Sequence, residues 1–398
     1  MWEELLIDSG LNDREVRSIL VLGSNPKMKA SELAKELGTT RLDAYNSLSR
    51  LQEMGIVTVT ADRPMRFSSM NVHQAIEHII GMRKQQLNRL VEGYDEISKN
   101  VTKETKPVIP HAQPQIEKWQ GENINSKEKL LIVSEQGLGD TFQFMRYIPY
   151  LRQKGIDVSF CTLKKLHGII KASGITSNPL TPEQGNDVTE GKWLPLLSLP
   201  RFLDVSPENP VVSKPYINSS VQLNDKWKEI LSKEKSTIIG INWQGNSNIE
   251  KTTLKGRSIP LELFSTIAKN NDYKFLSLQK GFGSEQLNTC SFRDHFVNCQ
   301  EEVNKSWDFL ETASIISNCD LVITSDTSVA HLSGGMGITT WCLLHYVPDW
   351  RWGMKGEKSF WYPSMKLFRQ EERNNWETVI EKVNIELKLF LSKKIIHE

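Results

Sequence analysis

The chain has 398 residues, of which 24% are charged and 38% are hydrophobic, and its formal net charge is +1. This length allows two or three domains, and the near balance of charge excludes an overall field that would draw the protein to nucleic acid or to a membrane. The five cysteines form no C-x-x-C pair, so we expect reduced thiols and no metal site. The N-terminal stretch MWEELLIDSG is acidic, and no segment approaches the roughly 20 apolar residues of a membrane span. We therefore expect a soluble cytoplasmic protein without a membrane span.

Three short helices are predicted near the N-terminus, over residues 13–22, 29–37 and 41–54. Gly38 stops the second helix, and Thr39 or Thr40 caps the third. We assign the inner face of the third helix to Leu42, Tyr45, Leu48 and Leu51. The stretch IVTVTADRPMRFSSM then predicts two short strands around an Asp-Arg-Pro turn. A helix, a helix–turn–helix and a β-hairpin in this order are typical of a winged helix.

The stretch KASELAKELGTTRLDAYNSLSRLQEMGIVTV resembles the TrmB-type transcription regulators of archaea, and the resemblance runs from Leu5 to about Asn100. Winged helices bind DNA through the third helix and the wing, where the candidate residues are Arg41, Asn46, Arg50, Arg63 and Arg66. Residues 27–70 hold seven basic and five acidic side chains. Such a weak positive balance is poor for neutralising phosphates, so protein contact is the alternative to DNA binding.

A heptad-like pattern follows the wing, with its seam at Ile76, Ile80, Arg83, Leu87, Leu90, Tyr94 and Ile97. The pattern predicts either a homodimer through a coiled coil over 76–97 or packing against the protein's own domains. The proline-containing stretch VTKETKPVIPHAQPQ has no apolar periodicity and predicts a linker.

After the linker, KLLIVS predicts a buried strand that runs into EQGLGDTFQFMRYIPYLRQKG. Gly137 and Gly139 permit a tight turn, and Asp140 or Thr141 caps a helix that continues through Arg152. IDVSFCT and KKLHGIIKASG predict a second strand and a second helix. This β-α-β-α order places the glycine turn at the carboxyl end of a parallel strand, where open α/β sheets bind ligands. G-L-G-D lacks the third glycine of a dinucleotide fingerprint.

A second α/β unit follows, with strands predicted within STIIGINWQGN, KFLSLQKG, HFVNC and LVIT. Polar or cationic residues stand at or near the ends of these strands: Gln244, Arg257, Lys280 and Ser325–Thr327. In SDTSVAHLSGGMG, a buried strand ends and Asp326, Thr327 or Ser328 caps a helix that has His331 in its first turn. Cations and capped helix starts on one rim indicate a polyanionic ligand, most simply a nucleotide diphosphate.

Eight segments, taken in order, resemble the GT-B glycosyltransferase domains that often follow tetratricopeptide repeats, akin to heptosyltransferases and O-GlcNAc transferases. They run from Trp119 to about Leu387: EQGLGDTFQFMRYIPYLR, PLLSLPRFL, GINWQGN, GRSIPLELF, FLSLQKG, DLVITSDTSVAHLSGGMG, PDWRWG and WYPSMKLFRQ. The chain departs from this family in two ways, because it has a winged helix in place of the repeats and His345 where a proline is commoner.

The resemblance implies a role for each matching residue. Asp140 would be the general base toward the acceptor hydroxyl. The donor diphosphate would be bound by Arg257, Lys280, Ser325, Asp326, Thr327, Ser328 and His331, with Gly137, Gly139 and Gln244 as further substrate-binding residues. The chain contains no D-x-D motif, which fits a metal-independent enzyme whose only small-molecule requirement is the nucleotide-sugar co-substrate.

The sequence thus predicts an α/β fold, a GT-B pair of Rossmann-like domains preceded by a winged helix. The expected boundaries are 1–72 for the winged helix, 73–100 for the coiled-coil-like helix, 101–126 for the linker, 127–225 and 226–374 for the acceptor and donor domains, and 375–398 for a helix that crosses back onto the first α/β unit. The expected function is glycosyl transfer from a nucleotide diphosphate sugar to an unknown acceptor. The alternative is a transcription regulator whose GT-B half senses a sugar nucleotide.

Overall fold

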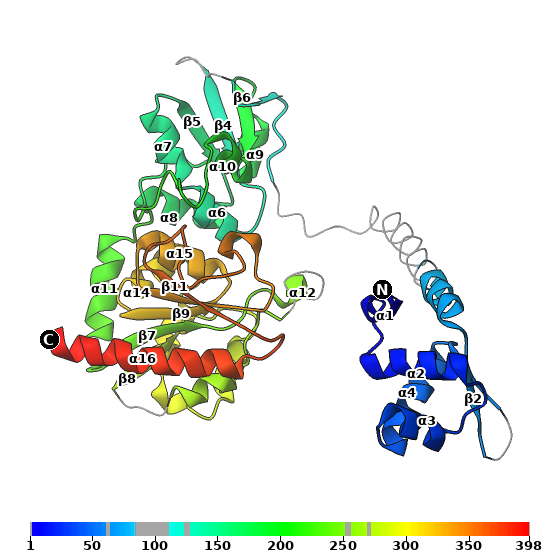
Figure 1. The fold of residues 1–398 in the computed structure, drawn as a ribbon. Helices are drawn as coiled ribbons and strands as arrows, with labels where there is room; N and C mark the ends of the chain where they lie inside the picture. The colour runs from blue at the N-terminus through cyan, green and yellow to red at the C-terminus, as the bar shows by residue number, and fades with distance from the viewer. Residues whose placement is uncertain are drawn as a thin grey trace. The chain divides into compact units, whose positions relative to one another are not determined.

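The computed structural model describes residues 2–60, 64–82, 84, 111–122, 128–250, 256–268 and 272–397. The chain divides into two units, Met1–Val108 and Ile109–Glu398, and each is described here by itself (Figure 1). None of the described helices combines the length and the apolar character that a membrane crossing requires.

The N-terminal unit has the predicted order of a winged helix. Its elements are α1 (Trp2–Asp8), α2 (Asp13–Ser24), α3 (Ala30–Leu37), α4 (Arg41–Glu53), β1 (Val57–Val59) and β2 (Phe67–Ser69), and residues 72–82 are helical. The predicted helix ends are confirmed, because Gly38 adopts φ 63° at the end of α3 and the Thr40 hydroxyl accepts a hydrogen bond from the Asp43 amide at 3.1 Å. The antiparallel pair β1–β2 forms the wing.

The inner face of α4 differs from the prediction. The buried residues are Ala44, Ser47, Leu48 and Leu51, whereas Leu42 is 70% exposed and Tyr45 is 42% exposed. The predicted residues are spaced by three, and a helix turns 100° per residue, so this series drifts around the helix and places Leu42 opposite Leu51. The buried set follows the i, i+3, i+4, i+7 spacing of one face.

The predicted seam over 76–97 is described only at its start. Ile76 is partly buried against the core of the unit, and Ile80 is 48% exposed. Ala75 and Ile79, which are not seam residues, are the buried ones. The remaining seam residues lie outside the described part of the chain: Arg83, Leu87, Leu90, Tyr94 and Ile97. Dimerisation through this helix therefore stays a prediction.

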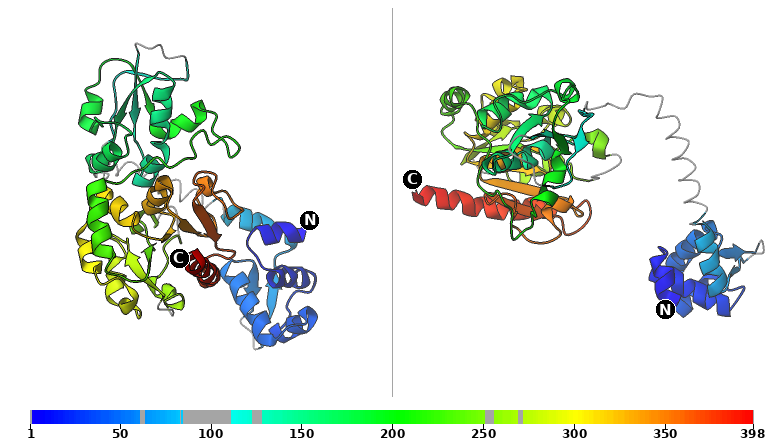
Figure 2. Two further views of the ribbon diagram at one scale, coloured as in Figure 1. Left: turned by 90° about the vertical axis from the view of Figure 1, so that its left-hand side faces the viewer. Right: turned by 90° about the horizontal axis from the view of Figure 1, so that it is seen from above.

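The C-terminal unit contains two separate sheets (Figure 2). The first has the order β3-β6-β4-β5 and is parallel throughout, with strands β3 (Glu117–Lys118), β4 (Lys129–Val133), β5 (Asp157–Cys161) and β6 (Lys192–Pro195). Its helical elements are α6 (Leu138–Phe144), α7 (Tyr147–Gln153), η1 (Lys164–Leu166), α8 (His167–Ala172), α9 (Pro182–Asn186), η2 (Leu196–Ser198) and α10 (Leu199–Phe202). The predicted single helix after β4 is divided into α6 and α7, because Pro149 has no amide hydrogen to donate to the Met145 carbonyl.

The second sheet has the order β11-β10-β9-β7-β8 and is also parallel throughout. Its strands are β7 (Thr237–Asn242), β8 (Tyr273–Ser277), β9 (Leu321–Ser325), β10 (Thr340–Leu344) and β11 (Met365–Arg369). Around it lie α11 (Val221–Leu231), α12 (Ser247–Glu250), η3 (Leu261–Thr266), η4 (Ser284–Asn288), η5 (Arg293–His295), α13 (Gln300–Lys305), α14 (Phe309–Ile316), α15 (Ser328–Met336), η6 (Trp350–Trp352) and α16 (Glu377–His397). The segment HFVNC, predicted as a strand, forms η5 and a single bridge between Phe275 and Phe296.

Three predicted boundaries need correction. Residues 111–122 were assigned to the linker, yet β3 extends the first sheet and Trp119 is 6% exposed. Helix α11 crosses the boundary at 225 and packs against α14 of the second half. Helix α16 does not cross back onto the first half but lies against the second sheet (Figure 1). Its apolar face packs in the core around Ile239 and Ile241, and Lys394 pairs with Asp320 at 2.6 Å.

Arg146 joins the two halves of the C-terminal unit through a fully buried guanidinium group, 1% exposed. It donates to the backbone oxygens of Gln143 (2.7 Å), Val212 (3.1 Å) and Trp361 (2.8 Å) and to the Tyr216 hydroxyl (3.1 Å). Its charge also lies over the rings of Tyr216, Trp361 and Tyr362, at 4.7 to 5.6 Å from their centroids. Among the described residues, no carboxylate pairs with it.

The backbone near Arg146 is strained to provide one of these acceptors. Val211 has φ 61°, in the left-handed region that a β-branched residue rarely occupies. The Val212 amide donates back to the Pro210 oxygen at 2.6 Å, which makes this a γ-turn with Val211 at its centre. The turn aims the Val212 oxygen at the guanidinium, so the strain is maintained by the buried cation.

We expect Arg146→Met to lower the free energy of unfolding of the C-terminal unit by about 2–4 kcal/mol, because several buried oxygens lose their donor. Arg201→Met is the control, since Arg201 is exposed and contacts only the Phe202 ring at 5.8 Å among the interactions described; its effect should stay within about 0.5 kcal/mol. Tryptophan fluorescence during denaturation measures this, because of the eleven tryptophans only Trp2 lies in the N-terminal unit. Equal losses in the two variants would contradict the role of Arg146.

Candidate functional site

The strand–loop–helix of residues 321–337 has the predicted form. Strand β9 ends at Ser325, the Thr327 hydroxyl accepts a hydrogen bond from the Val329 amide at 3.3 Å, and α15 begins at Ser328. The helix ends at Gly337 with φ 76°. The first turn of α15 therefore presents backbone N–H groups and the positive end of a nine-residue helix at the carboxyl edge of the sheet.

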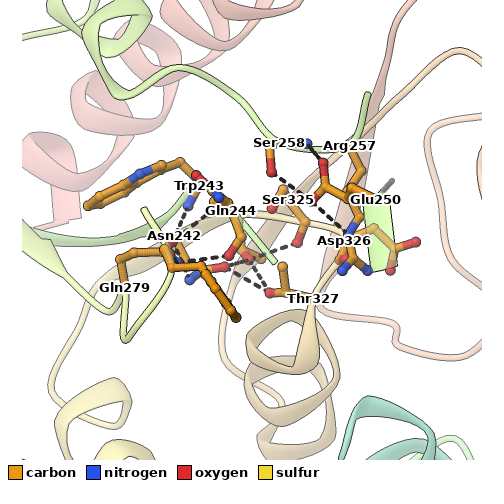
Figure 3. Close-up of polar contacts among 12 residues, drawn as sticks. Asn242, Trp243, Gln244, Glu250, Arg257, Ser258, Gln279, Ser325, Asp326 and Thr327 are labelled. Carbon is orange, nitrogen blue, oxygen red and sulfur yellow. Dashed lines mark hydrogen bonds and ion pairs between the residues drawn. The ribbon is translucent and has the colours of Figure 1, made fainter. Parts of the chain in front are cut away.

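A network of two buried amides fixes this edge (Figure 3). The Gln279 oxygen accepts from the Asn242 side chain (2.9 Å) and from the amides of residues 243 (3.1 Å) and 244 (3.0 Å). The Asn242 oxygen accepts from the hydroxyls of Thr324 (3.2 Å) and Thr327 (2.8 Å). The carboxyl ends of β7, β8 and β9 are thus joined by side chains. Neither amide was among the predicted site residues, although each follows an apolar run, which was the available signal.

Arg257 is buried beside the start of α15. Its Nη1 donates to the backbone oxygen of Asp326 at 3.1 Å, and its Nε pairs with Glu250 at 3.3 Å (Figure 3). Glu250 also accepts from the Ser258 amide (3.2 Å) and hydroxyl (2.7 Å). Gly245 provides the space, because a Cβ there would lie 2.3 Å from a guanidinium nitrogen. The structure therefore brings Arg257 and the predicted phosphate loop together.

Asp326 is 5% exposed. Burial, helped by the nearby Asp349 carboxylate, raises the pKa of its carboxyl to about 6, against the opposing effects of Trp352, Arg351 and Arg257. A buried carboxylate at the end of a strand costs folding free energy, which is typical of a functional position.

Two other predicted rim residues are held away from this cluster. The Lys280 amine donates to the Val303 oxygen at the end of α13, and burial lowers the pKa of this amine to about 8. The Gln244 side chain accepts from Gln286 at 3.2 Å and lies against Gly283. Neither side chain has a described contact with Arg257 or Asp326.

His331 is enclosed rather than presented on a rim. It is 2% exposed, its Nδ1 lies 2.8 Å from the Tyr362 hydroxyl, and its ring stacks on Trp352 with 5.2 Å between centroids. Burial, reinforced by Arg351 and Arg146, holds the pKa of His331 well below its usual value, so the ring is neutral at neutral pH. Its Cδ2 would lie 2.8 Å from a Cβ at Gly139, so α6 and α15 approach too closely at this glycine for a larger residue.

Asp140 lies at the start of α6, where both of its oxygens are engaged. The predicted cap at Asp140 or Thr141 is wrong, because α6 begins at Leu138 and its N-cap is Gly137. Asp140 is the third residue of the helix, and one of its oxygens accepts from the Gly137 amide at 2.8 Å, as in a capping box. The other lies 2.5 Å from Nη2 of Arg351, which comes from η6 in the other half of the unit. Arg351 lies within the segment PDWRWG but was not among the predicted site residues, because a contact across 211 positions of the chain leaves no local pattern.

Three buried polar atoms at the ends of β9, β10 and β11 have no hydrogen-bond partner among the described residues. They are the Ser325 hydroxyl, Nδ1 of His345 and Nε2 of Gln370. His345 is 6% exposed, and burial together with Arg257 lowers its pKa. Unpartnered buried groups are uncommon in native proteins, and a ligand is one of the partners that can satisfy them.

The candidate DNA-binding residues divide into two sets. Arg41 and Asn46 are exposed on α4. Arg50 instead pairs with the buried Glu15 at 2.9 Å and donates to the Gly10 oxygen at 3.2 Å. Arg66 donates to the Lys27 oxygen at 2.9 Å, and Arg63 lies outside the described residues.

Comparison with known families assigns the first unit. Residues 5–73 match the family model described as sugar-specific transcriptional regulator TrmB. These residues form a TrmB-type domain. No curated protein sequence matches the chain. A possible transcriptional regulator from Methanosarcina mazei is similar in structure to the part of the chain that includes the TrmB-type domain, with 16% identity, 24% of this chain and 86% of that chain covered, and a TM-score of 0.20.

Two solved structures are similar over a larger part of the chain. The glycosyl transferase family 9 protein from Veillonella parvula is 12% identical, covering 67% of this chain and 98% of that one, with a TM-score of 0.47. The ADP-heptose lps heptosyltransferase II of E. coli is 10% identical, covering 67% and 99%, with a TM-score of 0.47. The unit that follows the TrmB-type domain has two parallel sheets joined through α6 and α15, which is the predicted GT-B arrangement.

We expect Asp326→Asn to stabilise the protein at pH 8 by up to about 3 kcal/mol, the free energy that corresponds to a pKa raised from 3.8 to about 6. The free-energy cost of burying the charged Asp326 carboxylate is fully present above pH 6. It declines as the pH falls toward 3.8, because the carboxyl takes up a proton at a higher pH in the folded state than in the unfolded state. The gain should therefore be roughly halved at pH 5. Denaturation at both pH values measures it, with the exposed Asp294→Asn as control. A gain independent of pH would contradict the assignment.

Proposed function

We propose that the C-terminal unit transfers a sugar from a nucleoside diphosphate sugar to an acceptor hydroxyl, without a metal ion. One observation carries this proposal: the starts of α6 and α15 meet between the carboxyl ends of two parallel sheets, with Asp140 on one helix and the Arg257–Asp326 cluster beside the other. Parallel α/β sheets bind ligands at this edge. A carboxylate on one helix and a candidate anion site at the start of the other suit transfer between a donor and an acceptor.

The donor diphosphate would be bound by the first turn of α15 and by the nearby arginines. Backbone N–H groups at a helix start bind phosphate oxygens, and an arginine adds charge-assisted hydrogen bonds. These groups would also stabilise the negative charge that develops on the leaving diphosphate, which is the role that a metal plays in other enzymes. His331 would support this site by packing, since its ring lies between Gly139 and Trp352.

Asp140 would act as the general base. In this step the acceptor hydroxyl gives its proton to the Asp140 carboxylate, and its oxygen forms a bond to the anomeric carbon of the sugar. The bond between that carbon and the diphosphate oxygen breaks, and the electron pair leaves with the nucleoside diphosphate.

A second function is favoured by the TrmB-type domain, whose family model is described as sugar-specific. The protein would then be a transcription regulator in which the GT-B half binds a sugar nucleotide without turning it over. Both functions require nucleotide binding, and only the enzyme requires a base. Either function places the protein in the cytoplasm, where nucleotide sugars and DNA are available together.

Asp140→Asn separates the two functions. Titration calorimetry with ADP-, GDP- and UDP-sugars first identifies the donor, and transfer or hydrolysis of that sugar is then followed by release of the diphosphate. For an enzyme, we expect the variant to lose on the order of 10²–10⁴ in rate while it still binds the donor. A wild-type protein that binds a donor without turnover would support the sensor. Failure of the wild type to bind any of these donors would contradict both functions.

The exposed residues of α4 test DNA binding by the TrmB-type domain. In gel shifts with genomic fragments, we expect Arg41→Ala to weaken binding and to reduce the slope of log affinity against log salt by about one, as the loss of one phosphate contact requires. Lys154→Ala, which removes an exposed cation in the other unit, is the control. If the full-length protein shifts no fragment at low salt, the domain is a protein-contact module.

A further inference from the structure

Arg351 contacts the proposed base but has no role of its own in the reaction proposed above. It lies in η6, where Asp349 caps the short helix by accepting from the Arg351 amide at 3.1 Å. Its side chain is 12% exposed and reaches Asp140 on α6 at 2.5 Å. Its charge also acts on Asp326 and His331, because it lowers the pKa of each. Arg351 is therefore a cation placed between the proposed base and the proposed phosphate site.

The contacts of Arg351 leave its hydrogen-bonding capacity partly unused. Its Nε lies 3.5 Å from an Asp349 oxygen but has no hydrogen-bond partner among the described residues, although it is buried. A guanidinium group has five donors in a planar fork and binds phosphate with two of them at once. A diphosphate that reaches this group provides more charge and more acceptors than the single Asp140 oxygen.

The same contact determines what Asp140 can do. One Asp140 oxygen caps α6 through the Gly137 amide, and the other is taken by Arg351. A general base needs one oxygen directed at the acceptor hydroxyl. In this structure each Asp140 oxygen already accepts one hydrogen bond, so an acceptor hydroxyl would have to share an oxygen with the Gly137 amide or with the Arg351 guanidinium. Departure of Arg351 frees one oxygen for the acceptor.

We propose that Arg351 is a further donor-binding residue that changes partner: it holds Asp140 while the site is empty and moves to the diphosphate when the donor binds. The exchange rests on the proposed glycosyltransferase function and adds an order of events to it. Donor binding frees the Asp140 oxygen, so the base becomes active only when a sugar is in place.

A double-mutant cycle tests this exchange in the full-length protein, using titration with inorganic pyrophosphate, ADP, GDP and UDP. Arg351→Met should weaken diphosphate binding by roughly 10- to 100-fold and leave binding of the parent nucleoside unchanged. Asp140→Asn should strengthen diphosphate binding by about 3- to 10-fold, because the arginine is no longer held by a carboxylate. In the double variant the gain from Asp140→Asn should disappear, since the arginine that it frees is absent.

The neighbouring pair Arg293 and Asp294 provides matched controls. Arg293 is 36% exposed in its side chain and pairs with Glu301 at 3.0 Å, and Asp294 is exposed. Arg293→Met and Asp294→Asn make the same chemical changes elsewhere and should leave every affinity as in the wild type. Arg351→Lys keeps the charge without the fork and should fall between the wild type and Arg351→Met, which provides a second variant if the methionine perturbs folding.

The outcomes separate the exchange from the function on which it rests. If Arg257→Met weakens diphosphate binding but Arg351→Met and Asp140→Asn do not change it, the exchange is wrong and the donor site stands. If Asp140→Asn strengthens binding equally with and without Arg351, the gain is a general loss of negative charge and the exchange is wrong. If the wild type binds neither pyrophosphate nor any of the three nucleotides, the proposed function fails as well.

Discussion

The two halves of the C-terminal unit depend on one buried cation, Arg146, which has no counter-ion within the described part of the chain. Protein oxygens and aromatic faces solvate the Arg146 guanidinium in place of water. These groups come from α6, from the connection around Tyr216 and from the segment at Trp361. A buried charge costs free energy unless its N–H donors have acceptors. Separating these segments would break several of the Arg146 hydrogen bonds at once. The strained γ-turn at Val211 is one sign of how strongly this centre constrains the backbone.

The geometry of the candidate site follows from this constraint. Arg146 follows α6 directly, so the glycine turn at the start of that helix is held against α15, and Gly139 allows the two helices to approach. Asp140 therefore faces residues of the opposite half at hydrogen-bonding distance, and Arg351 takes up the contact. The Asn242–Gln279 network fixes the opposite wall independently, through side chains at the ends of three strands. One wall of the site is thus positioned by a cation and the other by amides.

Local signals in the sequence were sufficient for much of this arrangement. Thr327 was predicted as a cap candidate because an apolar strand, a hydroxyl residue and a helix are consecutive, and the parallel strands follow from their apolar runs. The predicted buried face of α4 was wrong because it rested on residues spaced by three. The i, i+3, i+4, i+7 spacing of one helix face would have given the correct residues. Arg351 and the true position of α16 were out of reach, since each depends on partners distant in the chain, whereas Gln279 follows an apolar run and could have been found. Lys280 shows the converse: a cation at the right strand end whose amine donates to a backbone oxygen of α13 instead.

The three unpartnered atoms at the ends of β9, β10 and β11 link occupancy of the site to the stability of the fold. The Ser325 hydroxyl, Nδ1 of His345 and Nε2 of Gln370 are buried without a hydrogen-bond partner among the described residues, which costs folding free energy. A ligand present at a hundred times its dissociation constant adds about 2.7 kcal/mol to the free energy of unfolding by mass action alone. Under the proposed function, resistance to heat and proteolysis should therefore follow the supply of donor, and the amount of folded protein in the cell would depend on that metabolite.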